Sequence, residues 1–174
     1  MLATIVVALS LASEQAHAQL LEDRRGDQIR ACQINIANID PEALPRSETP
    51  VVLVNFFIIS PAPEQLSVLV EARRAIVSSA GSIEETPLDR VTFTDQDDML
   101  FSFECSNIQG ECYSGPMEFG PVIGYIASRI NGAPMTLDLH GEDGAEYFDL
   151  TLDFSGKLRM IDILRCTDAI LDQY

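Results

Sequence analysis

The chain has 174 residues, of which 47% are hydrophobic and 22% are charged, and this is the composition of one folded domain with a sizeable core rather than of a disordered protein. Its 27 acidic and 11 basic residues give a formal net charge of −16. A field of that sign repels phosphate backbones and anionic lipid surfaces, so it argues against a nucleic-acid-binding protein and favours a cationic partner or simple solubility.

The first twelve residues form an apolar run that is too short to span a membrane but fits the hydrophobic part of a secretory signal. Ala16-His17-Ala18 has the small-residue pattern of a cleavage site. We therefore predict a signal peptide over residues 1–18 and a single disulfide-stabilised, β-rich domain over residues 19–174, with no integral membrane segment after signal removal. The alternative is a buried N-terminal helix.

Strand patterns dominate the first half of the predicted domain. Cys32, Ile34 and Ile36 alternate with polar residues, which predicts a half-buried strand with Cys32 on its inner face. Residues 51–59 are nearly all apolar and predict a strand buried on both faces. Residues 65–80 fit a helix or two short strands equally well.

Two hairpins and two helices are predicted in the second half. Hydrophobic alternation indicates one hairpin over residues 91–105 and another over residues 135–154, each with polar or glycine-rich turn residues in the middle. Helical spacing of apolar residues indicates helices over residues 121–130 and 157–171. The sequence therefore predicts a mainly β fold, a single antiparallel β-sandwich-like domain with two short helices, one of them C-terminal.

Four cysteines in an exported chain are typical of two disulfides, for which three pairings are possible. Cys105 and Cys112 flank a short polar loop that contains Gly110, so adjacency favours pairing them and leaves Cys32 with Cys166. We expect Cys166 to face the core, because it shares one helical face with Ile163 and Ile170. On this interpretation all four cysteines are structural.

Catalytic and metal-binding uses of the cysteines are less well supported. A redox pair usually has Cys-x-x-Cys spacing and a depressed thiol pKa, whereas here Glu104 and Glu111 lie beside the two sulfurs and would raise it. The spacing of Cys105 and Cys112 does not fit a zinc knuckle, and no second Cys or His pair completes four ligands. We predict no catalytic residue, no metal and no cofactor.

Two further groups of polar residues are candidate sites. His140 shares a strand face with Asp138, and Asp149 or Asp153 could lie opposite, which would permit a weak metal site or a His-carboxylate pair; a solvated polar face is the favoured interpretation. Residues 95–98 resemble the start of a calcium loop. The glycine and glutamate that such a loop needs are replaced by Leu100 and Ser106, so a simple turn is favoured.

Several segments together resemble the invasion-associated locus B family of exported bacterial proteins. They are "ACQINIANI", "FSFECSNIQGECYSGPMEF", "INGAPMTLDLHG" and "FDLTLDFSG", followed by the closing helix. The resemblance implies a non-enzymatic periplasmic or secreted protein that acts through contacts with a protein partner, in the envelope or at a host surface. The alternatives are an envelope thiol-disulfide factor that uses Cys105 and Cys112, and an inhibitor-type module that presents the loop between them.

Overall fold

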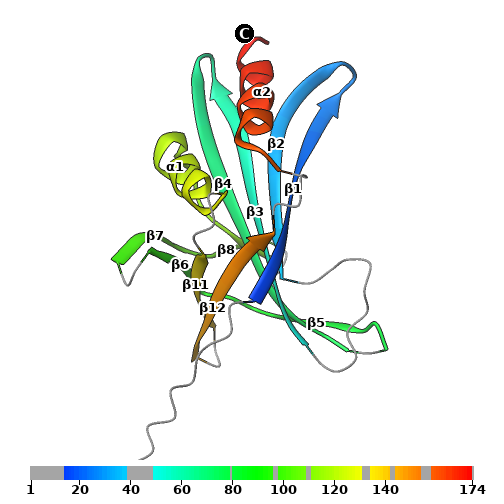
Figure 1. Ribbon diagram of the computed structural model, residues 1–174, viewed down its shortest axis with the longest axis vertical. Helices are drawn as coiled ribbons and strands as arrows, with labels where there is room; N and C mark the ends of the chain where they lie inside the picture. The colour runs from blue at the N-terminus through cyan, green and yellow to red at the C-terminus, as the bar shows by residue number, and fades with distance from the viewer. Residues whose placement is uncertain are drawn as a thin grey trace, which may run out of the picture.

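A computed structural model describes residues 14–38, 49–78, 80–95, 98–108, 111–130, 134–141, 144–153 and 158–173. Within those ranges the chain forms a 12-stranded sheet and two helices (Figure 1). In chain order the elements are β1 (Glu14–Arg25), β2 (Gln28–Ala37), β3 (Thr49–Ala62), β4 (Gln65–Val77), β5 (Ile83–Thr86), β6 (Arg90–Asp95), β7 (Asp98–Glu104), β8 (Ser106–Ile108), β9 (Glu111–Tyr113), β10 (Met117–Glu118), α1 (Phe119–Ile130), β11 (Met135–Gly141), β12 (Gly144–Asp153) and α2 (Met160–Leu171).

The strands follow one hydrogen-bonded path, β7-β6-β11-β12-β1-β2-β3-β4-β9-β8, with β5 and β10 also paired to β4. Every pairing is antiparallel except that of β1 with β12, which is parallel. The two ends of the path, β7 and β8, are consecutive in the sequence and are separated only by Cys105. The sheet therefore curls until its ends meet, and one continuous sheet supplies both layers of the predicted sandwich-like fold.

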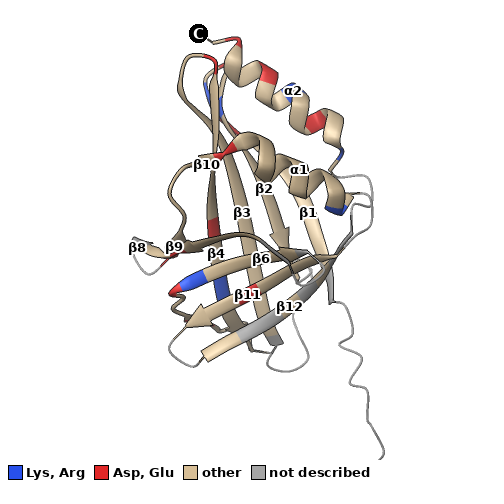
Figure 2. Cartoon of the chain, turned by 90° about the vertical axis from the view of Figure 1, so that its left-hand side faces the viewer, with Lys and Arg blue, Asp and Glu red and all other residues tan. Residues whose placement is uncertain are grey.

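The long strands β1 to β4 form one layer, and β6, β7, β11 and β12 cross over it to form the other (Figures 1 and 2). Both helices lie on the same side of the long strands (Figure 2), α2 against β2 and α1 against β4. We call the side of β2 to β4 that faces the helices the inner face, and the opposite side the outer face.

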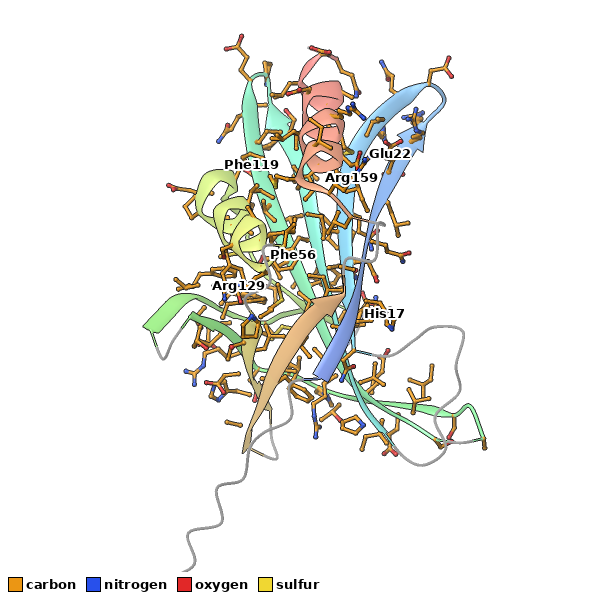
Figure 3. The ribbon with its side chains drawn as sticks, viewed as in Figure 1. His17, Glu22, Phe56, Phe119, Arg129 and Arg159 are labelled. Carbon is orange, nitrogen blue, oxygen red and sulfur yellow. A yellow bond between two sulfur atoms is a disulfide. The ribbon has the colours of Figure 1, made fainter. Side chains whose placement is uncertain are left out.

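The inner face is apolar. Phe56 is fully buried there, and its ring lies 5.8 Å from that of Phe93 on β6. Phe93 stacks on Phe101 at 4.4 Å and meets Tyr125 of α1 edge-on at 5.9 Å. This aromatic cluster joins the two layers to helix α1, near the position labelled for Phe56 in Figure 3.

The structure confirms the predicted mainly antiparallel β fold with two helices, one of them C-terminal. Both predicted hairpins and both predicted helices are present, and Ile163, Cys166 and Ile170 are buried on one face of α2. The ambiguous segment 65–80 is one long strand, β4, over most of its length. Strand register with β3 decided this, because residues 65–77 pair with β3 along its length.

Strand β1 was not predicted. It begins at Glu14, pairs with β12 through residues 14–17 and with β2 through residues 17–25, and buries Ala16 and Ala18. The predicted cleavage after Ala18 lies inside this strand, and the signal peptide stays a prediction. Among the described residues, no helix is long and apolar enough to cross a membrane.

Candidate functional site

A network of polar side chains runs across the outer face of the long strands. Strand register places Asn35, Asn55, Glu71 and Tyr113 in one row over β2, β3, β4 and β9. Asn55 lies between Val54 and Phe56, which are fully buried in the core, so alternation directs its side chain to the outer face. The outer-face network comprises Gln33, Asn35, Asn55, Glu71, Arg73, Glu85, Glu111 and Tyr113.

Asn55 connects the two halves of this network. Its amide oxygen accepts hydrogen bonds from the side-chain amides of Gln33 at 3.1 Å and Asn35 at 2.8 Å. Its amide nitrogen donates to a carboxylate oxygen of Glu71 at 2.7 Å. Asn55 is only 4% exposed, so these bonds replace the water that its amide would otherwise bind.

Glu71 is the most buried charge of the network, at 2% exposed. One of its carboxylate oxygens accepts from Asn55 and the other accepts from the guanidinium of Arg73, two residues along the same strand face. Arg73 also forms an ion pair with Glu111 and approaches Glu85 at 3.8 Å. Partial burial lowers the pKa of Arg73, but the hydrogen bond to Glu71 and the charges of the three carboxylates outweigh this and raise it above its ordinary value.

Tyr113 ends the network on β9. Its hydroxyl donates a hydrogen bond to Glu111 at 2.5 Å. That bond, with a smaller effect of burial and of nearby carboxylates, raises the pKa of Tyr113 to about 12. The phenol therefore stays protonated at neutral pH and is a hydrogen-bond donor there rather than a nucleophile.

The network is better suited to binding a charged group of a partner than to activating a nucleophile. Three carboxylates, on Glu71, Glu85 and Glu111, surround the single guanidinium of Arg73, so this part of the outer face is locally acidic. Glu85 is 54% exposed along its side chain and Glu111 is 25% exposed. The ion pair with Arg73 restrains Glu111, which lowers the entropy that a partner must remove on binding.

All four cysteines are in disulfides, Cys32 with Cys166 and Cys105 with Cys112, which are the pairs that the sequence favoured. The first joins the inner face of β2 to α2. The second lies where the sheet closes, since Cys105 is the bend between β7 and β8 and Cys112 is paired with Ala72 of β4. The backbone N–H of Cys105 also donates to the carbonyl of Asp89 at 2.8 Å.

The Cys105–Cys112 bridge is poorly placed for thiol-disulfide exchange. Cys112 is 2% exposed and Cys105 is half-buried, so an attacking thiolate has restricted access to either sulfur. The bridge holds β8 and β9 side by side, and the loop residues 109–110 between them lie outside the described part of the chain.

The structure does not place His140 opposite Asp149 or Asp153, as the predicted metal site or His-carboxylate pair would need. His140 pairs with Ala145 across the hairpin and with Arg90 on β6, whose guanidinium lies 3.4 Å from Nδ1 of the ring. Asp149 pairs instead with Thr136 and Asp153 with His17, so the expectation that either lies opposite His140 is wrong. The hairpin closes at Gly141 and Gly144, several residues away from both aspartates.

The calcium-like segment joins the paired strands β6 and β7. Asp95 and Asp98 are paired in the register of β6 with β7, and residues 96–97, on which the turn prediction falls, lie outside the described ranges. Among the described residues there is no group of three or more His, Cys, Asp or Glu arranged to hold a metal ion.

Sequence reasoning missed the whole outer-face network. Two pairs of residues, Glu71 with Arg73 and Glu111 with Tyr113, have the spacing of two that places side chains on one face of a strand. This spacing is informative only where the segment is already predicted to be a strand. Asn55, a single amide inside an apolar run, was the one local indication. A polar residue in such a run needs buried partners, and those of Asn55 come from β2 and from β4, whose secondary structure the sequence leaves ambiguous.

Comparisons with protein-family models, with curated proteins and with solved structures found no match to this chain.

Proposed function

We propose that this protein is a non-enzymatic binding domain, exported to the periplasm or the medium, that acts by contacts with a protein partner in the envelope or at a host surface. The observation that carries the proposal is the outer-face network, in which Arg73 forms ion pairs with Glu71 and Glu111 and lies 3.8 Å from the exposed Glu85 on the same sheet face. Its excess of carboxylates and the net charge of −16 favour a cationic segment of the partner.

The two disulfides support the exported location, because such bonds form and persist in oxidising compartments. The resemblance to the invasion-associated locus B family is part of the same proposal. A thiol-disulfide factor is the competing function, and the restricted access to Cys105 and Cys112 disfavours it.

Mass spectrometry of the exported protein, alkylated with and without prior reduction, tests compartment and chemistry together. We expect no alkylation until the protein is reduced, and an N-terminus at Gln19, which would remove the residues of β1 that pair with β12. Free alkylation of Cys105 and Cys112 in the native protein would instead support the thiol-disulfide factor. Any other N-terminus would show that the predicted cleavage site is wrong.

Site-directed photo-cross-linking tests the binding surface. A photo-reactive amino acid at Glu85, the most exposed carboxylate of the network, is compared with the same group at Arg159, the N-cap residue of α2, which is 63% exposed. We expect an adduct from position 85 only, weakened by salt and by Glu111→Lys, since reversing one charge repels a cationic partner. Equal adducts from both positions, or an adduct insensitive to Glu111→Lys, would reject this surface.

A further inference from the structure

Strand β5 has a hydrogen-bonded neighbour on one side only. It pairs with β4, and no other strand in the described part of the chain pairs with it. It lies at the end of the sheet remote from both helices (Figure 1). Ile83 is 66% exposed and the side chain of Glu85 is 54% exposed, so this edge is open to solvent. Another chain can therefore reach it.

The hydrogen bonds of the hairpin formed by β4 and β5 show which backbone groups point to this edge. At the turn, the N–H of Ser78 donates to the carbonyl of Ser82 at 2.9 Å. Bonded and non-bonded pairs alternate along an antiparallel ladder, so the register makes Ile76 with Glu84 the next bonded pair. The backbone groups of Glu84 therefore point to β4.

Ile83 and Glu85 lie at the non-bonded positions of this ladder, and their N–H and C=O groups point away from β4. The same alternation holds farther along this side of β4, where the carbonyl of Val70 accepts a hydrogen bond from the N–H of Ser114 at 2.8 Å. The edge of β5 thus presents alternating donors and acceptors to solvent, which is what an added strand requires.

The side chains of this edge place two different chemistries on the outer face. Glu85 approaches Arg73 at 3.8 Å, so it lies on the face that carries the outer-face network. Ile83 is two residues away and therefore lies on the same face, whereas Glu84 points to the other one. An added strand thus meets an acidic and an apolar side chain at alternate positions, beside the ion pair of Arg73 with Glu111.

A second copy of this chain does not suit the edge. The two antiparallel registers that overlap β5 most with its own copy are centred on Glu84 or on Glu85. Each register places two carboxylates directly opposite one another, which is unfavourable. The net charge of −16 on each copy adds to this repulsion. Charge complementarity instead favours a cationic strand from another protein.

We propose that the free edge of β5 binds an extended segment of the partner as an added antiparallel strand, with a lysine or arginine opposite Glu85 and, two residues later, an apolar residue opposite Ile83. This binding mode rests on the proposed function, because it takes the acidic outer face as the binding surface. Antiparallel pairing suits the edge, since each outward residue then exchanges both of its hydrogen bonds with one partner residue. The backbone bonds supply affinity and the two side chains supply selectivity.

A short peptide with blocked ends and the central sequence Thr-Lys-Thr-Val-Thr is the probe, and the isotopically labelled full chain is titrated with it. In antiparallel pairing its lysine meets Glu85 and its valine meets Ile83. We expect saturable shifts of the amide NMR signals of β5 and slower hydrogen exchange at Ile83 and Glu85, whose N–H groups gain acceptors. The N–H of Glu84 is already bonded to β4, so its exchange should change less. No saturable shift, or no added protection at Ile83 and Glu85, would overturn the proposal.

Methylation of the peptide backbone separates strand pairing from charge attraction. A methyl group on the backbone nitrogen of the lysine removes a donor that points to β5, and it should weaken binding at least about tenfold. A methyl group on the backbone nitrogen of the next threonine, which points away from β5, should change binding by less than about twofold. Equal effects of the two methyl groups would overturn the added strand.

Protein variants and the order of the peptide test the side-chain contacts. Glu85→Gln should weaken binding about two- to fivefold, as expected for an exposed ion pair. Glu84→Gln makes the same charge change on the other face and should alter binding by less than about twofold. The reversed sequence Thr-Val-Thr-Lys-Thr places valine opposite Glu85 and should bind more weakly. Equal binding to both variants, or equal binding of the reversed peptide, would overturn the assignment.

These outcomes distinguish a failure of the added strand from a failure of the proposed function. A salt-sensitive partner adduct from position 85, together with peptide binding that is insensitive to the site of backbone methylation, would keep the acidic binding surface and reject the added strand. Absence of both the adduct and the peptide binding would reject both.

Discussion

The two faces of strands β2 to β4 are made by alternate residues of the same segments, yet they are stabilised differently. On the inner face, Phe56 is fully buried among aromatic and branched side chains and helix residues. On the outer face, Asn55 and Glu71 are almost as buried, and each depends on specific hydrogen-bond partners. Apolar burial tolerates changes that conserve volume, whereas a buried polar group loses stability whenever one partner is removed.

The two faces also differ in what they contribute to the protein. The inner face, with its disulfide to α2, holds the sheet in shape, and the outer face displays fixed charges on that shape. A binding surface built on a sheet is positioned more accurately than one built on loops, because both neighbours of each strand fix its backbone. Changes on the inner face should therefore affect mainly stability, and exposed changes on the outer face should affect mainly binding.

The largest effect is expected for the disulfide on the inner face. Replacing both Cys32 and Cys166 by Ala should lower the free energy of unfolding by about 5 kcal/mol, because the bridge closes a loop with a sequence separation of 134. The matched change at Cys105 and Cys112, separated by 7, should cost about 2.5 kcal/mol. Urea denaturation of both double variants measures the difference. Equal losses would show that loop closure does not set the contribution of either bridge.

The second-largest loss of stability is expected from a change in the apolar packing of the inner face. Phe56→Ala should lower the free energy of unfolding by about 3–5 kcal/mol, because it leaves a cavity in the aromatic cluster. Phe57→Ala, at the neighbouring half-buried position on the outer face, should cost less than half as much. Both are measured by chemical denaturation. A larger loss from Phe57→Ala would mean that the assignment of inner and outer faces is reversed.

A smaller effect is expected in the outer-face network. Glu71→Gln keeps the shape but removes the charge that pairs with Arg73, and it should cost about 2 kcal/mol, since Arg73 retains Glu111. Glu84→Gln, at an exposed position of β5, should change stability by less than about 0.5 kcal/mol. If the two variants unfold at the same urea concentration and with the same dependence of the free energy on urea, the buried carboxylate of Glu71 contributes no more to stability than a surface carboxylate does.

The smallest effect near neutral pH is expected for Tyr113→Phe, about 1 kcal/mol or less. The contribution of the Tyr113 hydroxyl to stability changes at high pH. The pKa of the phenol rises from 10.0 in the unfolded chain to about 12 in the folded protein, so the folded state holds a proton that the unfolded state loses between these values. Stability from this group is complete below pH 10.0 and is lost as pH rises toward about 12.

Ultraviolet absorbance titration of the tyrosines checks this prediction. The difference between the wild-type protein and Tyr113→Phe should be one phenol that ionises near pH 12. The variant should also lose less stability than the wild type between pH 10.0 and about 12. A difference curve centred near 10.0 would mean that the hydrogen bond from Tyr113 to Glu111 does not persist in solution.

Much of the fold could be predicted because it depends on local alternation. The pattern around Cys32 and Ile34 and both later hairpins place apolar residues at every second position, and each strand is half-buried as expected. The spacing of Ile163, Cys166 and Ile170 predicts the C-terminal helix. Strand β1 was not predicted, because its first residues lie in the segment that the sequence assigns to a signal peptide.

The candidate sites were less predictable than the fold. The outer-face network needs β9 beside β4 and Asn55 beside Glu71, and both contacts depend on strand register. No local pattern records either contact.

The sequence by itself determined the class of elements, the buried faces of most strands and both helices, and the excess of negative charge, because periodicity and composition are local properties of the chain. Tertiary structure decided that β4 is a strand, that one sheet closes on itself at Cys105, and which polar residues meet on its outer face. The physical reason is that strands are completed by hydrogen bonds to partners distant in sequence, so their order and register follow from the packing of the whole sheet.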